Sequence, residues 1–188
     1  MSQFFIFALP RSRTFWTSRF LCQKGWVCHH DLVARLANLK AIEDIMSEPR
    51  SGLADTGLAL GWRYVRERFP ESRFAVIRRN RKAVEDSIRA LGLDPRWANL
   101  DDLEHALDEL DQQPGTLSID FDELDHEAPV RALVHHCLGT EFDFERWEAM
   151  RHVNLQIDMK RRLEQLRRNH DRLRALKQKL KVHDHVPA

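Results

Sequence analysis

A short apolar run near the N-terminus ends abruptly in a basic loop, and this junction constrains the fold more than any other feature of the sequence. Residues 3–9 (QFFIFAL) are apolar without alternation, which is typical of a strand buried on both faces of a parallel sheet. Pro10 interrupts the strand, and the pattern from Thr14 to Gln23 predicts a helix that ends before Gly25. A buried strand, a tight loop and an immediate helix predict a parallel β-α unit.

Strand-like and helix-like segments alternate through the rest of residues 1–152, and Asp31 and Asn99 are expected to cap the helices that follow them. Further strands are predicted over 51–56, 73–78 and 114–121, and helices over 31–46, 57–69, 81–91, 99–111, 129–138 and 143–150. This order predicts an α/β fold, a three-layer sandwich with a central parallel sheet of about four strands and right-handed crossovers.

The segment from 153 to 188 has a different pattern, with leucines at heptad-like spacing and basic residues on the other faces. Residues 151–181 carry eleven Lys and Arg against three acids. We expect a long basic amphipathic C-terminal helix beyond the sandwich of residues 1–152. Its leucine seam favours packing on the domain or forming a homodimer, and the alternative is a surface for nucleic acid or an acidic membrane.

Overall composition excludes several classes of protein. The chain has 30 Lys and Arg against 29 Asp and Glu, a formal charge of +1, which argues against a nucleic-acid coat protein or an acidic disordered chain. No apolar run approaches the roughly 20 residues of a membrane-spanning helix. Three cysteines without CxxC spacing predict neither a disulfide framework nor a zinc site (Cys22, Cys28 and Cys137). With no recognisable leader, a reducing, cytoplasmic location is expected.

The loop at residues 10–14 (PRSRT) is a candidate anion site. Parallel sheets bind ligands at the carboxyl ends of their strands, and the first turn of a helix there offers unpaired N–H groups to an anion. Arg11 and Arg13 add fork-shaped cationic donors, and Ser12 and Thr14 add hydroxyls. The alternative is an ordinary surface turn with two solvated arginines. The glycines and lysine of the pattern GxxxxGK[ST] are absent, which argues against an ATP- or GTP-binding loop.

Two motifs in register resemble a known family. PRSRTFW resembles the 5′-phosphosulfate loop of sulfotransferases that use 3′-phosphoadenosine 5′-phosphosulfate (PAPS), usually P-[KR]-S-G-T-x-W after the first strand. VIRRNRKAVEDSI resembles the 3′-phosphate element of that family, in which a Ser follows an Arg by eight residues, as Ser87 follows Arg79 here. Weaker likenesses to its acidic segments lie at 116–124 and 139–147. The likeness is greatest to short bacterial and phage members, whose fold is P-loop NTPase-like.

The resemblance implies transfer of a sulfuryl group from PAPS to a hydroxyl or amine acceptor, with no metal required. It places Arg11 where the family usually has the lysine that stabilises the bridging oxygen. The remaining cofactor-binding residues are Ser12, Arg13 and Thr14 on the 5′-phosphate, and Arg79 and Ser87 on the 3′-phosphate, with Arg78 as a substitute. Arg13 departs from the pattern, which has a glycine there, and the family's C-terminal glycine-containing loop has no match.

A catalytic base must reach the same edge of the sheet. His29, His30 and Asp31 follow the first predicted helix and open the second. We predict His30 as the base, with Asp31 as its orienting partner or as the base itself. The alternative is that Asp31 only caps the helix and the histidines are surface loop residues. Asp55 and Thr56, at the end of the second predicted strand, are a weaker choice.

Two other functions stay open. A divergent P-loop nucleotide kinase or phosphotransferase would use Asp120 or Asp122 to hold a metal. A non-enzymatic binding protein would act through the basic C-terminal helix. The expected partners are a nucleotide-type small molecule and an acceptor that the sequence does not identify. Large aromatic residues are expected in the core, the alternative being an acceptor pocket lined by Phe15, Trp16, Trp26, Trp62 and Trp97.

Overall fold

The computed structural model describes residues 3–36, 38–153 and 155. The chain divides into two compact units, Met1–Val153 and Asn154–Ala188, and the fold below is that of the first. The C-terminal helix expected over 153–188, with its roles in dimerisation or nucleic-acid binding, lies outside the described residues except for Val153 and Leu155.

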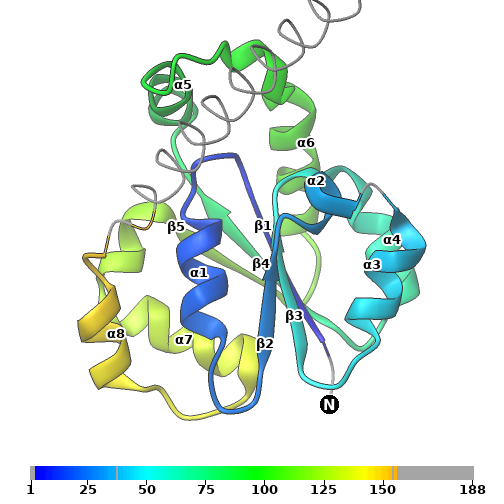
Figure 1. Cartoon of the computed structure of the whole chain (residues 1–188), viewed down its shortest axis with the longest axis vertical. Helices are drawn as coiled ribbons and strands as arrows, with labels where there is room; N and C mark the ends of the chain where they lie inside the picture. Colours follow the sequence, from blue (N-terminus) through cyan, green and yellow to red (C-terminus); the bar gives the residue numbers. More distant parts are fainter. Residues whose placement is uncertain (1–2, 37, 154, 156–188) are drawn as a thin grey trace, which may run out of the picture. The chain divides into compact units, whose positions relative to one another are not determined.

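Five parallel strands form one sheet in the order β2-β3-β1-β4-β5 (Figure 1). They are β1 (Phe4–Ala8), β2 (Val27–His30), β3 (Ser51–Asp55), β4 (Arg73–Arg78) and β5 (Thr116–Asp120). Every residue of β1 is buried, as its unbroken apolar run predicted. Because all strands are parallel, their carboxyl ends meet at one edge of the sheet, and the loops that follow them lie together there.

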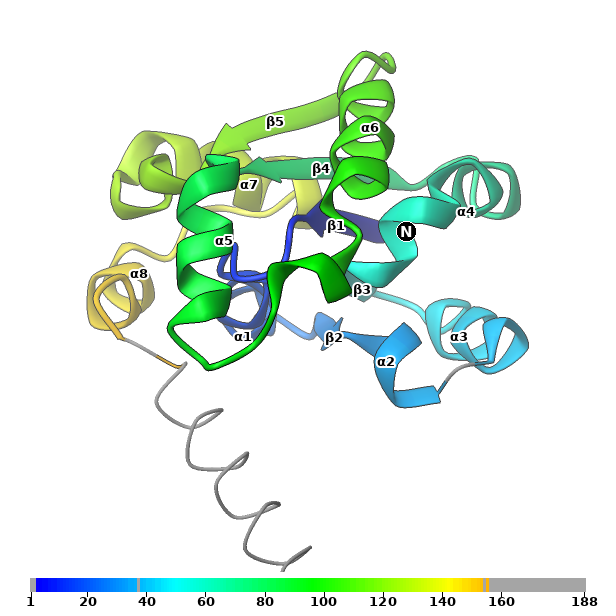
Figure 2. The same cartoon turned by 90° about the horizontal axis from the view of Figure 1, so that it is seen from above.

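Helices cover both faces of the sheet, so the predicted three-layer α/β sandwich is confirmed. The α-helices are α1 (Thr14–Leu21), α2 (Leu32–Leu36), α3 (Leu39–Met46), α4 (Trp62–Arg68), α5 (Arg81–Arg89), α6 (Leu100–Asp111), α7 (Glu127–Leu138) and α8 (Phe144–Met150), and the 3-10 turns are η1 (Gly57–Gly61), η2 (Pro95–Ala98) and η3 (Phe121–Asp125). One face is covered by α1 and α7, with α8 against α1, and the other by α3, α4 and α6 (Figure 2).

Alternate side chains of β1 fill the two sides of the core. Phe5 and Phe7 join the hydrophobic cluster beneath α3, α4 and α6. Phe4 faces the other side, where its ring centroid lies 5.4 Å from that of Trp26. Gly52 pairs with Phe4 in the sheet, and a Cβ there would come within 2.0 Å of the Phe4 ring. The aromatic core of this face therefore requires a glycine at the second position of β3.

The chain differs from the sequence prediction in three places. The fifth strand, β2, was not predicted, because VCHH is a short edge strand without an apolar run. The helix predicted over 31–46 is divided into α2 and α3, and the side chain of Asn38 begins α3 by accepting a hydrogen bond from the N–H of Ala41. Asn99 precedes α6 with a left-handed backbone (φ 46°) and makes no side-chain capping bond, and its amide nitrogen donates to Asp102.

Helix α8 holds α1 at both of its ends. At the C-terminal end, the guanidinium of Arg146 donates to three carbonyl oxygens, those of Arg19, Phe20 and Cys22. Near the N-terminal end, Nε1 of Trp16 donates to the carbonyl oxygen of Met150 over 2.8 Å. Because α8 holds α1 at two points, the position of the loop between β1 and α1 is fixed at its α1 end.

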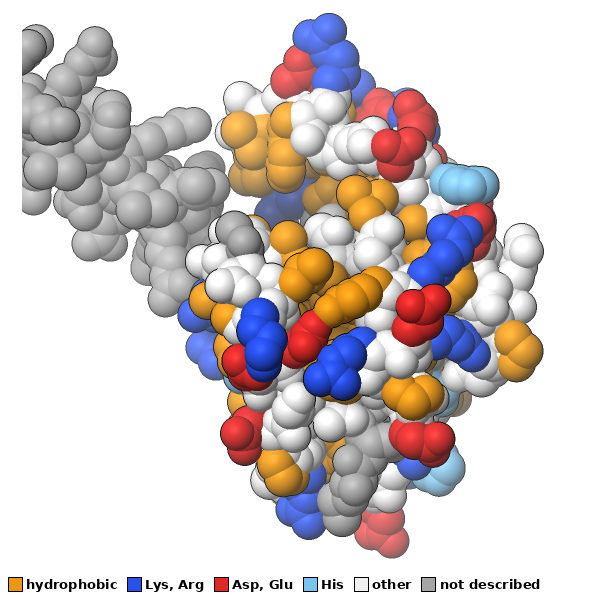
Figure 3. All heavy atoms as spheres, turned by 90° about the vertical axis from the view of Figure 1, so that its right-hand side faces the viewer, with side chains coloured by type: hydrophobic (Ala, Val, Ile, Leu, Met, Phe, Trp, Pro, Cys, Tyr) orange, Lys and Arg blue, Asp and Glu red, His pale blue; other side chains and the backbone are white. Residues whose placement is uncertain are grey.

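The outer face of α2, α3 and α4 carries acidic and basic side chains in a mixed pattern (Figure 3). Several of them are paired, for example Lys40 with Asp44 and Arg68 with Glu43.

Trp97 is 61% exposed, whereas the other tryptophans are in the core as predicted. None of the helices within the described residues is long and apolar enough to cross a membrane.

Candidate active site

The loop between β1 and α1 has an unusual backbone. Arg11 and Arg13 both have left-handed conformations, with φ of 68° and 61°, which side chains other than glycine rarely adopt. Such residues concentrate at functional sites, where the surrounding structure holds them. Between them, Ser12 is fully buried, and its Oγ has no hydrogen-bond partner in the part of the chain that the structure describes. A buried hydroxyl without a partner beside the N-terminus of α1 is a donor ready for an anion.

Arg79 joins this loop from the neighbouring strand. It follows β4, and its Nη1 donates to the carbonyl oxygen of Arg11. Its guanidinium carbon lies 4.1 Å from the ring centroid of Phe121, a cation–π contact. Its Nε is buried and has no hydrogen-bond partner among the described residues. Two contacts therefore fix the guanidinium of Arg79, and its Nε–H remains able to donate to a ligand.

Helix α5 completes the basic cluster. Nε of Arg11 donates to Oγ of Ser87 over 3.2 Å. Arg11, Ser12, Arg79 and Ser87 therefore meet where the carboxyl ends of β1 and β4 approach α5. Burial, followed by the positive charge of Arg79, lowers the pKa of Arg11, and burial also lowers the pKa of Arg79. Both remain charged near neutral pH. The negative charge of Asp122 partly opposes the lowering at Arg79, and the two half-buried guanidinium groups give this point of the site a positive character that suits an anion.

Two arginines predicted for this site are used elsewhere. Arg13 pairs with Asp125 over 2.7 Å and donates to the carbonyl oxygen of Arg151 over 2.6 Å. Its side chain is therefore not brought together with Arg11 and Ser12, and only its backbone remains at the loop, in the left-handed conformation that suits the glycine of the resembling motif.

Arg78 does not serve as a substitute for Arg79. Its guanidinium pairs with Asp108 over 2.7 Å and with Asp111 over 3.0 Å, both on α6. The acidic run of α6 also binds Arg81, which pairs with Asp101 and Glu104. These ion pairs fix the acidic helix α6 against the arginines of β4 and α5.

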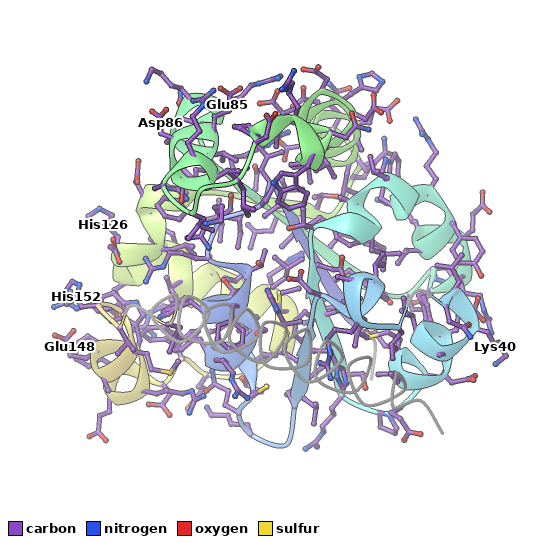
Figure 4. The ribbon with its side chains drawn as sticks, turned by 45° about the horizontal axis from the view of Figure 1, so that its top comes forward. Lys40, Glu85, Asp86, His126, Glu148 and His152 are labelled. Carbon is purple, nitrogen blue, oxygen red and sulfur yellow. The ribbon has the colours of Figure 1, made fainter. Side chains whose placement is uncertain are left out.

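A surface cavity of about 550 Å³ opens beside Arg79. Its wall is formed by Arg78, Arg79, Asn80, Ala83, Asp120, Phe121, Asp122, Glu123 and His126. His126 lies on the opposite side of the molecule from Lys40 (Figure 4). The carboxylate of Asp120 is used in a capping box with Glu123 at the start of η3. No cluster of three or more His, Cys, Asp or Glu side chains suited to a metal ion occurs within the described residues.

The predicted base lies on the other side of the loop, at the end of β2. Nε2 of His30 is 3.1 Å from Oγ1 of Thr14 and 3.3 Å from Oδ2 of Asp31. The pKa of His30 is lowered to about 4, chiefly by burial; the negative charge of Asp55 opposes this shift and the positive charge of Arg35 adds to it. The structure therefore brings Thr14, His30 and Asp31 together, with the imidazole neutral near pH 7.

Asp55 organises this corner. Its carboxylate is 1% exposed, with Oδ1 accepting from the N–H of Leu58 at 2.9 Å and Oδ2 from the N–H of Val33 at 3.1 Å. The N–H in the first turn of α2 is thus satisfied by Asp55, and the cap expected from Asp31 is replaced. Asp31 instead has a left-handed backbone (φ 48°) beside His30, and burial raises its pKa. The sequence does not reveal this role, because Asp55 meets the N–H of Val33, 22 residues earlier, only in the folded chain.

His30 makes the stability of the fold depend on pH. Its pKa is about 4 in the native state against 6.5 in the unfolded chain, so the unfolded chain binds more protons between these values. The free energy of unfolding therefore rises with pH through this window; the contribution is complete above pH 6.5 and is lost as pH falls to 4. We expect His30→Gln to flatten the profile by about 3 kcal/mol between pH 4 and 7 in urea unfolding.

Asp31 and Asp55 titrate in the opposite direction, because burial raises the pKa of both. Both carboxyl groups are present in the wild-type protein and in His30→Gln, so the difference between the two profiles reports His30 together with its coupling to Asp55. Parallel profiles for His30→Gln and the wild-type protein would contradict this account.

Together, the parallel sandwich and the basic loop between β1 and α1 define a P-loop-like α/β protein. Its fold is similar to that of mouse sulfotransferase SULT7A1 complexed with PAP, with a TM-score of 0.58 and 15% identity over 80% of this chain. This match covers 63% of the sulfotransferase chain. It is also similar to a gluconokinase from Sinorhizobium meliloti 1021, with a TM-score of 0.50, 13% identity and coverage of 73% of this chain and 90% of that one. Neither a family model nor a curated protein matches the sequence.

Proposed function

We propose that this protein is a sulfotransferase that moves a sulfuryl group from PAPS to a hydroxyl or amine acceptor. The observation that carries the proposal is the junction of the two predicted phosphate elements: Arg79 donates to the loop at Arg11, and Arg11 donates to Ser87. These residues come from segments far apart in the sequence, and each was predicted to bind one end of the same doubly phosphorylated nucleotide. The likeness to a sulfotransferase fold complexed with PAP supports the same function.

PAPS, the sulfuryl donor, would be held at both its 5′-phosphate and its 3′-phosphate. Oγ of Ser12 and the first N–H groups of α1 suit the 5′-phosphate. Arg79 suits the 3′-phosphate, and Ser87, which accepts from Arg11, still has its own O–H to donate. The cavity beside Arg79 and Phe121 has the volume for a nucleoside between them.

Transfer then depends on position and charge. The acceptor oxygen forms a bond to sulfur, the bond from sulfur to the bridging oxygen breaks, and its electron pair stays on the 5′-phosphate. Arg11 stabilises the negative charge that develops on the bridging oxygen, and because guanidinium stays protonated it acts by charge alone. The acceptor proton passes to His30, and Asp31 stabilises the imidazolium that forms, 3.3 Å away.

Calorimetric titration with 3′-phosphoadenosine 5′-phosphate (PAP) tests the proposal. We expect micromolar binding that survives a chelator, and binding of 5′-AMP at least about 100-fold weaker, because 5′-AMP lacks the 3′-phosphate that Arg79 and Ser87 would hold. Equal affinities for PAP and 5′-AMP, or no heat with either, would overturn it.

A phosphotransferase is the second candidate, since the gluconokinase match covers 90% of that chain. It requires ATP turnover that depends on Mg²⁺, whereas the loop here has neither the lysine nor the glycines of an ATP-binding loop. ATP turnover without PAP binding would favour it.

A cytoplasmic location is part of the proposal and is supported by the free thiols Cys22, Cys28 and Cys137.

A further inference from the structure

The hydroxyl of Thr14 belongs to both halves of the site. Thr14 is the first residue of α1, where the 5′-phosphate of the donor is expected, and its side chain is buried. Its Oγ1 lies 3.1 Å from Nε2 of His30, the proposed base at the end of β2. The ring of Phe15, also on α1, packs edge-on against His30 with the ring centroids 5.2 Å apart.

Each of the two atoms can form only a limited set of bonds. A threonine hydroxyl has one proton, and Nε2 of a neutral imidazole has either one proton or one lone pair. If Thr14 donates to His30, the lone pair of Nε2 is occupied. If Nε2 carries the proton and donates to Thr14 or Asp31, there is no lone pair. In the first tautomer the contact occupies the lone pair, and in the second it stabilises the form that has none, so in both it opposes transfer of the acceptor proton to Nε2.

We propose that Thr14 is a positioning residue that couples PAPS binding to the base: its hydroxyl holds Nε2 of His30 in the absence of PAPS and turns to the 5′-phosphate when PAPS binds. This inference rests on the proposed function. The imidazole then carries its proton on Nδ1 and presents the lone pair of Nε2 to the acceptor. The acceptor O–H bond breaks, its proton forms the new N–H bond, and the acceptor oxygen attacks sulfur.

The charges around His30 support this order of events. Asp31 and Asp55 favour the protonated imidazole, whereas Arg35 on α2 and burial disfavour it, and burial dominates. The ring of Phe15 separates His30 from another cation, because the guanidinium carbon of Arg19 lies 5.5 Å from the centroid of that ring. A phosphate at the start of α1 adds negative charge close to His30 and removes the hydroxyl that engages it. Both changes strengthen the base when a donor is present to react with.

Nitrogen-15 NMR of the histidine side chains in the full-length protein, with and without PAP, tests the coupling. We expect saturating PAP to raise the proton affinity of His30 at least about tenfold and to move the Nε2 signal. PAP that binds by calorimetry but leaves both unchanged overturns the coupling and leaves the proposed function standing. Failure of PAP to bind overturns the proposed function, and the coupling with it.

Three variants separate coupling from a structural role. Thr14→Val keeps the branched side chain but removes the hydroxyl, so we expect the Nε2 signal of the free protein to move toward its PAP-bound position. Thr14→Ser restores the hydroxyl and should restore the wild-type signal. Thr17→Val, one turn along α1, removes a hydroxyl that donates to the carbonyl oxygen of Arg13 and should leave the signal unchanged. If Thr14→Val behaves like Thr17→Val, the coupling is wrong; if it fails to fold, the wild-type comparison decides.

Discussion

Replacing Arg79 by alanine is expected to weaken PAP binding about 100-fold. The guanidinium is half-buried, is held over Phe121, and has one buried N–H without a partner in the described chain. Removing a desolvated cation from a phosphate typically raises the free energy of binding by about 2–5 kcal/mol. Calorimetry with PAP and with 5′-AMP measures the change, and the ratio of the two affinities is the informative quantity.

That ratio separates two roles of Arg79. If its charge binds the 3′-phosphate, Arg79→Ala lowers the affinity for PAP toward that for 5′-AMP, whose binding changes little. If Arg79 only supports the loop through the carbonyl oxygen of Arg11, both nucleotides lose affinity equally, which contradicts the assignment. Lys40→Ala is the matched control, because it removes the same charge from an exposed helix on the opposite side of the molecule from His126 (Figure 4).

Local sequence was sufficient to locate the centre of this site. The apolar run of β1, the break at Pro10 and the helix from Thr14 are adjacent in the chain, and their order alone predicts a loop at the carboxyl edge of a parallel sheet. The distance between Arg79 and Ser87 in the sequence was likewise fixed by one strand end and one helix. These parts of the fold and site depend on short-range patterns.

Long-range pairing was beyond such patterns. Arg13 and Arg79 look equally suited to an anion in the sequence, but Arg13 finds Asp125, 112 residues away, while Arg79 meets the loop. Arg78 is consumed by Asp108 and Asp111 of α6. Which arginine is available depends on the partner that each meets in the folded chain, and this is a property of topology.

The surroundings of the proposed base His30 were also only partly predictable from local sequence. Strand β2, which carries His29 and His30, was not predicted, because an edge strand with polar residues lacks the apolar run that marks β1. Asp31 was expected to cap the following helix, yet the buried carboxylate of Asp55 does so across the sheet edge. The pair His30 and Asp31 was nevertheless found correctly as neighbours, since they are consecutive in the chain.

Of the substitutions considered, replacing Arg11 is expected to have the largest effect on the rate of sulfuryl transfer. Desulfation of PAPS by water, followed as release of PAP, reports transfer without requiring the natural acceptor. Arg11→Met should slow this reaction by roughly 100- to 1,000-fold, because one preorganised donor at a developing negative charge contributes about that much. PAP affinity should fall less than about tenfold, since Ser12 and Arg79 remain in place. Lys40→Met, which removes one charge far away, should have no effect on the rate.

Arg11→Lys tests whether charge or shape matters. Nε of Arg11 is fixed by Ser87, and lysine cannot form that contact with the same fork-shaped geometry. If charge dominates, Arg11→Lys retains at least about a tenth of the wild-type rate and acquires a decline at high pH, as a lysine beside Arg79 loses its proton. The wild-type rate should show no such decline, because a guanidinium does not titrate there. Loss of activity in Arg11→Lys equal to that in Arg11→Met would instead assign the effect to the contact with Ser87.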